Sequence, residues 1–410
     1  MDIRPRCYDK VVQLIEKGVD IANPLTIDIG DEVDIGLISG NNVRIYPGTR
    51  IYGDKTVISS GARIGYEGPA TIDNCQLASG VELKGGYFAG SVFLEKASMG
   101  LGAHVREGCI LEEEASGAHC VGIKQTILFP FVTLGSLINF CDCLMAGGTS
   151  RKDHSEVGSS YIHFNFTPDG DKTTPSLIGD VPRGVMLNQP AIFLGGQGGM
   201  VGPVRMGYGN VVSANSVIRN DYLAENKLIV GKTHPAMMID IKRHDYPNIV
   251  RTVENNVVYI ANLNALEQWY IHVRRSFLER GKFGGLIFSG LIEKLALARS
   301  ERLKRLEMLA EKAWKASVQK AAGKQELYEK FAEIASAFSS GLNDGLNDAN
   351  RDAFLSRFSD RTGSAQPSYI AAIKGLDEET CTAGVRWLQG IVDGYCARAR
   401  ATAPSLGIFR

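Results

Sequence analysis

Two cationic side chains, Arg106 and Lys124, stand 18 residues apart in a stretch of short repeated segments. Where a chain winds into triangular coils of about 18 residues, side chains at this spacing lie above one another on neighbouring coils. Two stacked cations repel each other unless an acid or an anionic ligand lies between them. An arginine fork and a lysine point charge suit a phosphate group. Neutralisation by Glu112, Glu113 or Glu114 is the alternative, and the spacing alone does not decide between them.

A second group of polar residues lies between 147 and 192, where four prolines interrupt the repeat. Two imidazoles in this segment, His154 and His163, are of the type that acts as a general base near neutral pH. The other polar candidates in the segment are Arg151, Lys152, Asn165, Asp169, Asp171, Lys172 and Arg183. A long interruption of this kind is either a solvated loop or a lid over a substrate.

The elements that would position these residues are repeated hexads. From about residue 27, runs of two or three branched apolar residues recur about every six positions, separated by glycine and small polar residues, as in Val57–Ala62. Each hexad supplies one short strand, and three hexads close one coil at the strand spacing of about 4.8 Å. The pattern predicts a left-handed parallel β-helix over 27–235, with an inserted loop over 147–192.

The two ends of the chain have a different sequence pattern from the hexad region. Residues 1–26 predict an N-terminal helix and lead-in, and residues 236–410 predict an all-α C-terminal region with apolar residues at helical spacing. Amphipathic helices are expected over 250–280, 287–322, 325–340 and 366–400. The glycine- and aspartate-rich segment 341–350 is expected to be a linker. The helical region would mediate oligomerisation or bind a protein partner, and the sequence does not say which.

The composition excludes several classes. Lys and Arg number 45, as do Asp and Glu, so the charge gives no indication of a nucleic-acid partner. No run of about 18 apolar residues occurs, so no membrane segment is expected. The eight scattered cysteines and the charged N-terminus predict free thiols and a cytoplasmic location. No metal site is predicted, because the pair Cys141 and Cys143, and Cys120 beside His119, are interpreted as small apolar residues.

Two stretches, Val105 to Ala146 and Phe193 to Asp221, resemble the acetyltransferase half of bifunctional N-acetylglucosamine-1-phosphate uridyltransferase/glucosamine-1-phosphate acetyltransferase. The resemblance places Arg106 and Lys124 on that family's sugar-phosphate-binding arginine and lysine. It implies that Asn165 positions the sugar. It also implies an acetyl-CoA or other acyl-CoA donor, and places three residues along the CoA groove: Gly196, Ala214 and Lys232.

This sequence departs from the family at the catalytic position. Ser136 stands where the family has its catalytic histidine, and Asn139 stands where it has a tyrosine. A serine hydroxyl is not basic at neutral pH, so it cannot take a proton from an amine. We therefore expect a relocated base, His163 or His154. Ser136, Asn139, Asn165, Asp169 and Lys172 are kept as substrate-contacting candidates.

A second resemblance is to bacterial proteins labelled UDP-N-acetylglucosamine pyrophosphorylase-like or uridyltransferase-like. It rests on the blocks SYIHFNFTPDGDKTTPSLIGDVPRG and FLGGQGGMVGPVRMGYG. The first 100 residues have hexads where a uridyltransferase half would need a glycine-rich nucleotide loop, so the residues do not support pyrophosphorylase chemistry.

Three functional hypotheses follow. The first is an acyl-CoA-dependent acyltransferase acting on a sugar phosphate or nucleotide sugar. The second is a non-catalytic trimeric scaffold that keeps the anion site and recruits a partner through its helices. The third is the uridyltransferase-like function that the label implies. The resemblance implies a homotrimer with clefts between subunits.

Overall fold

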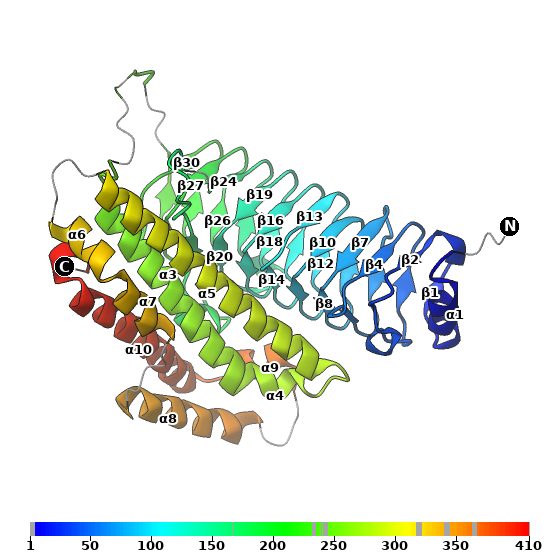
Figure 1. Cartoon of the computed structure of the whole chain (residues 1–410). Coiled ribbons are helices and arrows are strands. Elements are labelled where there is room, and N and C mark those ends of the chain that lie inside the picture. The colour runs from blue at the N-terminus through cyan, green and yellow to red at the C-terminus, as the bar shows by residue number, and fades with distance from the viewer. Residues whose placement is uncertain are drawn as a thin grey trace.

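The computed structural model describes residues 5–165, 167–231, 235–238, 240, 245–316, 322–339, 345–362 and 367–409. A triangular stack of parallel strands forms the first half of the chain, and helices lie along one side of it (Figure 1). The prediction of a left-handed parallel β-helix followed by a helical region is confirmed.

Three parallel sheets form the walls of the β-helix, and we name them A, B and C in the order in which each coil visits them. Sheet A consists of β1 (Asp20–Ile21), β3 (Arg44–Ile45), β6 (Arg63–Ile64), β9 (Glu82–Leu83), β12 (Ser98–Met99), β15 (Ser116–Gly117), β18 (Thr133–Leu134), β23 (Glu156–Val157), β26 (Phe193–Leu194), β29 (Val211–Val212) and β31 (Leu228–Ile229). Sheet B consists of β2 (Asp28–Ile29), β4 (Arg50–Tyr52), β7 (Ala70–Asp73), β10 (Gly86–Ala89), β13 (Ala103–Val105), β16 (Gly122–Lys124), β19 (Asn139–Cys141), β24 (Ile162–Phe164), β27 (Gly199–Val201) and β30 (Val217–Ile218). Sheet C consists of β5 (Val57–Ile58), β8 (Gln76–Leu77), β11 (Val92–Phe93), β14 (Ile110–Leu111), β17 (Ile127–Leu128), β20 (Cys143–Met145), β25 (Ser176–Ile178) and β28 (Arg205–Met206).

The chain turns from one sheet to the next at corners where single residues take left-handed backbone angles. At the corner between sheets A and B, which we call the A/B corner, Gly102, Cys120, Leu137 and Ser160 have φ between 57° and 75°. The inward residue of most strands is aliphatic or aromatic and is buried, so successive coils share one continuous core. At the N-terminal end, helix α1 (Tyr8–Glu16) packs Val11 and Leu14 against the first coil.

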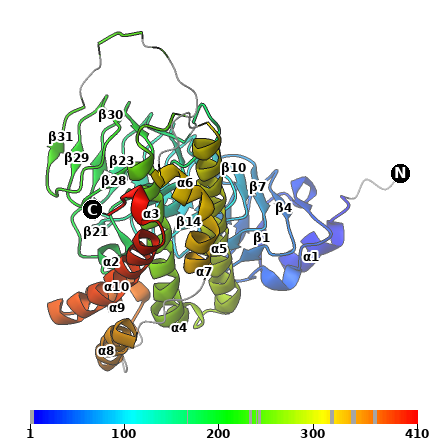
Figure 2. The ribbon, with the colours of Figure 1, turned by 60° about the vertical axis from the view of Figure 1, so that its left-hand side comes forward.

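Sheet C differs from the other two sheets because both of its faces are buried. Its strands carry consecutive apolar residues, such as Val92-Phe93 and Ile110-Leu111, whereas sheet A alternates a polar and an apolar residue, as in Glu82-Leu83. A strand with two buried faces needs a second layer to cover it. Helices α3 (Ile249–Trp269) and α5 (Gly284–Lys315) provide that layer, as the turned view in Figure 2 shows.

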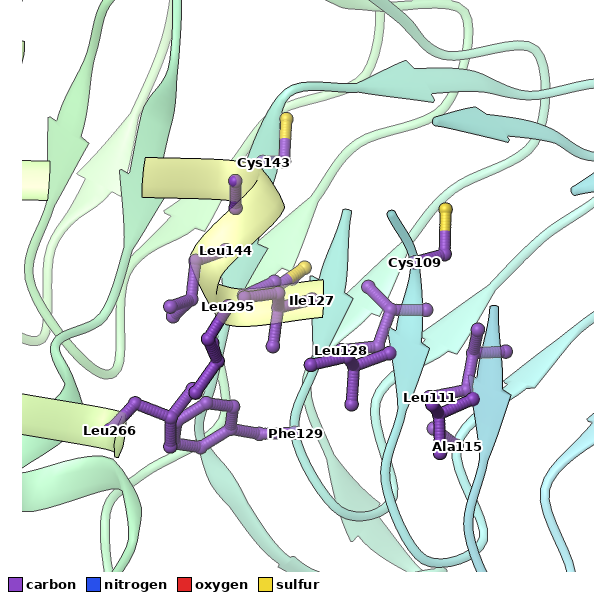
Figure 3. Close-up of a cluster of buried hydrophobic side chains, with 14 of the residues drawn as sticks. Cys109, Leu111, Ala115, Ile127, Leu128, Phe129, Cys143, Leu144, Leu266 and Leu295 are labelled. Atoms are coloured by element: carbon purple, nitrogen blue, oxygen red, sulfur yellow. The ribbon is translucent and has the colours of Figure 1, made fainter. Parts of the chain in front are cut away.

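The core of the β-helix and the core of the helical region are therefore one. Leu266 of α3 and Leu295 of α5 pack with Leu128, Phe129 and Leu144 of the β-helix (Figure 3). The rest of the helical region consists of η3 (Tyr270–Arg274), α4 (Arg275–Leu278), α6 (Ala322–Glu329), α7 (Phe331–Ser339), α8 (Gly345–Thr362), α9 (Tyr369–Lys374), α10 (Glu378–Thr402) and η4 (Pro404–Leu406). Short helical turns η1 (Pro24–Thr26) and η2 (Ile35–Leu37) belong to the first coils.

Two sequence expectations need correction. The segment 147–192 is not one protruding loop, because β23, β24 and β25 within it form regular rungs of the stack. Around this coil stand a hairpin of β21 (Gly148–Ser150) and β22 (Asp153–His154), the loop 167–175, and the short helix α2 (Val181–Gly184). The expected linker 341–350 contains the start of α8, which begins at Gly345.

Buried ion pairs join the two regions. Arg274 of η3 binds Glu113 at 2.6 Å and Glu112 at 2.7 Å, and all three side chains are buried. Arg302 of α5 binds Asp142 at 3.0 Å. Because a buried charge that loses its partner is strongly destabilising, these contacts fix the helices on sheet C.

Candidate functional site

Arg106 and Lys124 are stacked as their spacing predicts. Val105 of β13 pairs with Ile123 of β16, so the residues that follow them occupy equivalent positions on neighbouring coils. Both side chains point outward at the end of sheet B, which we call the B/C corner. The guanidinium of Arg106 reaches past Lys124 and donates to Cys141 Sγ at 3.6 Å.

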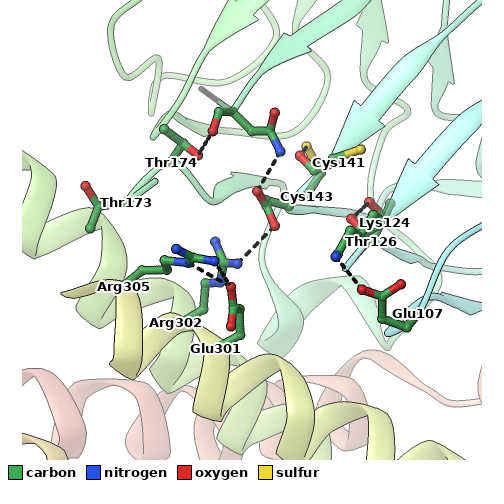
Figure 4. A network of polar contacts seen from close by, with 12 residues as sticks. Glu107, Lys124, Thr126, Cys141, Cys143, Thr173, Thr174, Glu301, Arg302 and Arg305 are labelled. Carbon is green, nitrogen blue, oxygen red and sulfur yellow. Dashed lines mark hydrogen bonds and ion pairs between the residues drawn. The ribbon is translucent and has the colours of Figure 1, made fainter. Parts of the chain in front are cut away.

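Lys124 forms an ion pair within the chain, with Glu107 rather than with Glu112, Glu113 or Glu114 (Figure 4). Partial burial raises the pKa of Glu107, but its hydrogen bonds to Lys124 and to the backbone, together with the charges of Lys124 and Arg106, outweigh burial and the net pKa is lowered. Glu112 and Glu113 belong instead to the buried cluster around Arg274. Arg106 has no carboxylate partner among the described residues, so one cation at this corner remains available to an anion.

Asn165 joins the same corner. Its amide donates to Asp142 at 3.0 Å, and Asp142 also accepts from Arg302 at 3.0 Å (Figure 4). The strand register places Asp142 and Asn165 on successive coils above Glu107. The structure therefore gathers Arg106, Lys124 and Asn165 along one edge, with Asn165 held by an acid that the helical region fixes.

The loop that follows Asn165 packs against helices. The carbonyl of Asp169 accepts from Lys312, and buried Asp171 accepts from Tyr246 at 3.0 Å. Lys172 is exposed, and its backbone amide donates to Thr167 at 3.0 Å. This loop spans from the B/C corner to the helical region.

His163 points into the β-helix. It is 1% exposed, its Nε2 contacts Ser176 Oγ at 2.8 Å, and its ring meets Phe140 edge-on. Burial lowers its pKa to about 4. Its side chain is thus on the opposite side of the wall from the exposed guanidinium of Arg106, and does not reach the cations in this arrangement.

His154 lies at a third place. It is part of the β21–β22 hairpin, whose Arg151 donates to the Phe131 and Glu114 carbonyls between sheets C and A. This C/A corner is a different edge of the triangle from the one that carries Arg106. His154 also does not stack on Ser136, because the hairpin adds residues and Ser159 takes that position.

Ser136 has a histidine partner that the sequence interpretation did not connect to it. Its Oγ lies 2.9 Å from Nδ1 of exposed His119, one coil earlier at the A/B corner. The register pairs Gly117 with Leu134, which aligns position 119 with position 136. Within the described residues no hydrogen bond occupies Nε2 of His119. The signal in the sequence for this pair was its spacing: His119 precedes Ser136 by 17 residues, about the length of one coil.

Small residues continue this corner above Ser136. The register stacks Ser159, Gly196 and Ala214 on successive coils. A Cβ on Gly158 would lie 2.4 Å from the Gly196 amide nitrogen, and one on Gly195 would lie 2.4 Å from that of Ala214. The coils approach too closely at Gly158 and Gly195 for side chains, so this corner presents a nearly bare strip of backbone, with only the small side chains of Ser159 and Ala214 along it. Lys232, the third candidate along this groove, lies outside the described residues.

Asn139 lies on exposed sheet B between the two corners, and its Oδ1 accepts from Cys141 Sγ at 3.2 Å. The predicted residues thus form two groups on the two edges of sheet B. Ser136, Gly196 and Ala214 lie at the A/B corner, and Arg106, Lys124 and Asn165 lie at the B/C corner. No group of three or more metal-ligating side chains occurs in the described segments.

Comparison with known proteins gives partial matches. No family model matches the chain. It is 30% identical to the bifunctional protein GlmU of Thermotoga maritima over 213 residues, which are 52% of this chain and 42% of that protein. It is 29% identical to GlmU of Acinetobacter baumannii over 217 residues, and 25% identical to GlmU of Carboxydothermus hydrogenoformans over 238 residues. These matches establish homology to the acetyltransferase region of GlmU proteins, while the chain spans less than half the length of these curated relatives.

Two solved structures are also similar. The polysialic acid O-acetyltransferase OatWY shares 14% identity with a TM-score of 0.16, over 56% of this chain and 92% of that chain. The UDP-N-acetylglucosamine acyltransferase of Campylobacter jejuni shares 12% identity with a TM-score of 0.15, over 50% and 67%. None of the helices described for this protein is both long and apolar enough to cross a membrane.

Proposed function

We propose that this protein is an acyltransferase that moves an acyl group from acyl-CoA to an amine or hydroxyl of a phosphorylated sugar or nucleotide sugar. The observation that carries the proposal is the exposed His119–Ser136 pair beside a nearly bare backbone strip. The homology to the acetyltransferase region of GlmU proteins points the same way.

His119 replaces His163 and His154 as our proposed base. If its Nδ1–H donates to Ser136 Oγ, its Nε2 keeps a lone pair that faces solvent. That nitrogen would take the proton from the acceptor as the acceptor attacks the thioester carbonyl, and the CoA thiolate would leave. The serine that cannot act as a base then has a role: it fixes the tautomer and orientation of the imidazole.

The donor and the acceptor would use the two corners. The strip at Ser159, Gly196 and Ala214 carries only small side chains, which leave room for an extended CoA arm. Arg106 would bind the phosphate of the acceptor, with Lys124 released from Glu107 or left paired.

For a sugar monophosphate acceptor, distance favours a site shared with a second copy. His119 and Lys124 are about five residues apart across sheet B, or about 16 Å at roughly 3.3 Å per residue. A sugar monophosphate does not span that gap, so we propose that the A/B corner of one copy meets the B/C corner of the next in a homotrimer.

Release of the CoA thiol from acetyl-CoA, measured with a panel of amino-sugar phosphates and nucleotide sugars, tests the proposal. His119→Gln should lower kcat by about 10²- to 10⁴-fold, because general-base catalysis contributes that much. Arg106→Ala should mainly raise KM. Lys304→Ala, on the exposed surface of α5, is the control and should change neither value. Absence of thiol release with every acceptor would remove the acyltransferase proposal.

Mixing the two variants, at an acceptor concentration far below the KM of Arg106→Ala so that each variant alone has little activity, tests the shared site. With His119→Gln and Arg106→Ala copies randomly assembled into trimers, about one quarter of the interfaces would hold both native residues. About a quarter of the native activity should therefore return. No recovery would place both residues in a single-chain site.

A non-catalytic scaffold remains the alternative, and the pairing of Lys124 with Glu107 favours it, since that pair weakens the anion site. On this reading sugar phosphates would bind in calorimetry, but no thiol would be released and His119→Gln would bind them equally well. The uridyltransferase-like alternative would instead require pyrophosphate release from UTP.

A further inference from the structure

A cavity of about 830 Å³ lies far from both corners of sheet B. One wall is the C/A corner of the early coils, and the other is the turn between α4 and α5 together with the chain just before α9. Its volume falls within the range of about 300–1,000 Å³ that is usual for small-molecule sites. Neither the proposed reaction nor the relatives assign a role to it.

Three cations from different parts of the chain line this cavity: Lys17, Arg280 and Lys282. None of them forms an ion pair with a carboxylate in the described part of the chain. Lys17 Nζ donates to the Ile35 carbonyl at 2.8 Å, and Arg280 donates to the Pro367 carbonyl at 2.8 Å. Lys282 lies over the ring of Phe283 at 5.1 Å.

The two acids on the same walls are already held in ion pairs. Glu113 is bound by buried Arg274 at 2.6 Å, and Glu95 is bound by Lys96 at 3.1 Å. Burial lowers the pKa of Lys17, and the nearby charge of Lys282 lowers it further, although Asp34 partly opposes this. The cavity therefore holds more positive than negative charge, which is the condition that favours an anionic ligand.

The opposite wall is a row of hydroxyls. Ser39, Ser59, Ser60 and Ser79 come from three successive coils at the C/A corner, with Ser59 and Ser60 on the same coil, and Ser60 Oγ lies 3.2 Å from Ser79 Oγ. Coils repeat at about 4.8 Å, so this row offers regularly spaced donors and acceptors. Such a row suits the hydroxyl groups of a sugar.

We infer that this cavity is a second ligand site, separate from the proposed acyl-transfer site, which binds a phosphorylated sugar between the cations of Lys17, Arg280 and Lys282 and the serine row. The phosphate contacts the cations and the sugar lies along the serines. Because the cations come from α1 and from the turn after α4, the bound ligand links the first coils to the tip of the helical region.

Calorimetry on the full-length protein tests this site, with N-acetylglucosamine 1-phosphate, inorganic pyrophosphate and uncharged N-acetylglucosamine as probes. The double variant Arg280→Glu/Lys282→Glu should weaken binding of both phosphorylated probes by at least about tenfold, and added salt should weaken it in the native protein. Both residues are exposed, so the variant should fold, which its thermal unfolding verifies. Lys304→Glu, an exposed cation elsewhere on the helices, should bind as the native protein does.

Two comparisons separate this site from the acyl-transfer site. Arg106→Ala and His119→Gln should keep the binding that Arg280→Glu/Lys282→Glu loses. Ser79→Tyr, which fills the serine row, should reduce binding of the sugar phosphate more than that of pyrophosphate. Binding unaffected by the double variant, binding lost only with Arg106→Ala, equal affinity for the uncharged sugar, or no binding of any probe would each overturn the inference.

Discussion

His163 and His119 occupy opposite sides of the β-helix wall. His163 is buried among aromatic side chains with its pKa lowered to about 4, whereas His119 is exposed and bound to Ser136. Side chains along a strand alternate between inside and outside, so their position in the rung decides which histidine can meet a substrate.

Burial of His163 should make the fold sensitive to acid. Between its ordinary pKa of about 6.5 and its folded pKa of about 4, the unfolded chain binds a proton that the folded chain does not. Stability from this group is complete above pH 6.5 and falls as the pH drops through that window, by about 2 kcal/mol between pH 7 and 4.5. Urea unfolding at both pH values measures it.

The variant His163→Met removes the titrating group, so its loss of stability between pH 7 and 4.5 should be smaller by that amount. His104→Ala, which changes an exposed histidine on sheet B, should leave the native pH dependence intact. An identical pH dependence in His163→Met and the native protein would contradict the assignment to this imidazole.

The periodicity of the coils predicts which residues stack on one another, but it does not predict which side chains form ion pairs or hydrogen bonds. The spacing of Arg106 and Lys124 correctly placed both at one corner. The sequence could not show that Glu107 would take Lys124, because several acids lie equally near in sequence. The pair of His119 and Ser136 could not be predicted from a fixed period of 18 residues, because coils vary by a residue or more in length. A period of 18 leads from Ser136 to His154, which the β21–β22 hairpin moves out of the stack.

At the scale of single elements, η3 and α5 supply buried charge where amphipathic helices would be expected to bury apolar residues. Arg274 lies between Glu112 and Glu113 and over the ring of Tyr369 at 3.9 Å. Burial raises the pKa of Glu112, although the charge of Arg274 opposes this. The helical pattern predicted most of these helices, but it could not predict a salt bridge between residues 162 positions apart.

Two adjacent arginines offer a matched comparison. Arg274→Met should reduce the free energy of unfolding by about 3–5 kcal/mol, because it leaves two buried carboxylates without a cation. Arg275→Met should cost about 0.5 kcal/mol or less, since Arg275 forms an exposed pair with Glu279 one turn away. Denaturant unfolding of both variants measures the difference, and equal losses would show that the buried cluster does not fix η3 on the β-helix.

At the scale of the whole molecule, the helices complete the β-helix rather than follow it. Sheets A and B remain open along their outer faces, while α3 and α5 cover sheet C (Figure 1). The consecutive apolar pairs in the strands of sheet C indicate that both faces of this sheet are buried, because a strand with one solvated face alternates polar and apolar residues. The sequence does not show which segment covers that face, since the contacting residues are far apart along the chain.

A fragment of residues 1–231 should therefore not be a stable, monodisperse protein. Without α3 and α5 it would expose the outer apolar row of sheet C, a patch of the kind that drives aggregation. Size-exclusion chromatography and binding of an apolar dye measure this. A control fragment of residues 5–410, which keeps both layers, should elute as the full chain does. A soluble, dye-negative fragment 1–231 would show that the β-helix is self-sufficient.

The salt bridge between Glu112 and Arg274 also limits how early the fold can be completed during biosynthesis. Arg274 follows Glu112 by 162 residues. At a ribosomal rate of about 5–20 residues per second, the nascent coils wait about 10–30 s before the segment that covers them has emerged. During that interval the outer apolar face of sheet C is exposed on the growing polypeptide. Production of this protein in cells should therefore depend on translation speed and on chaperones that shield such surfaces.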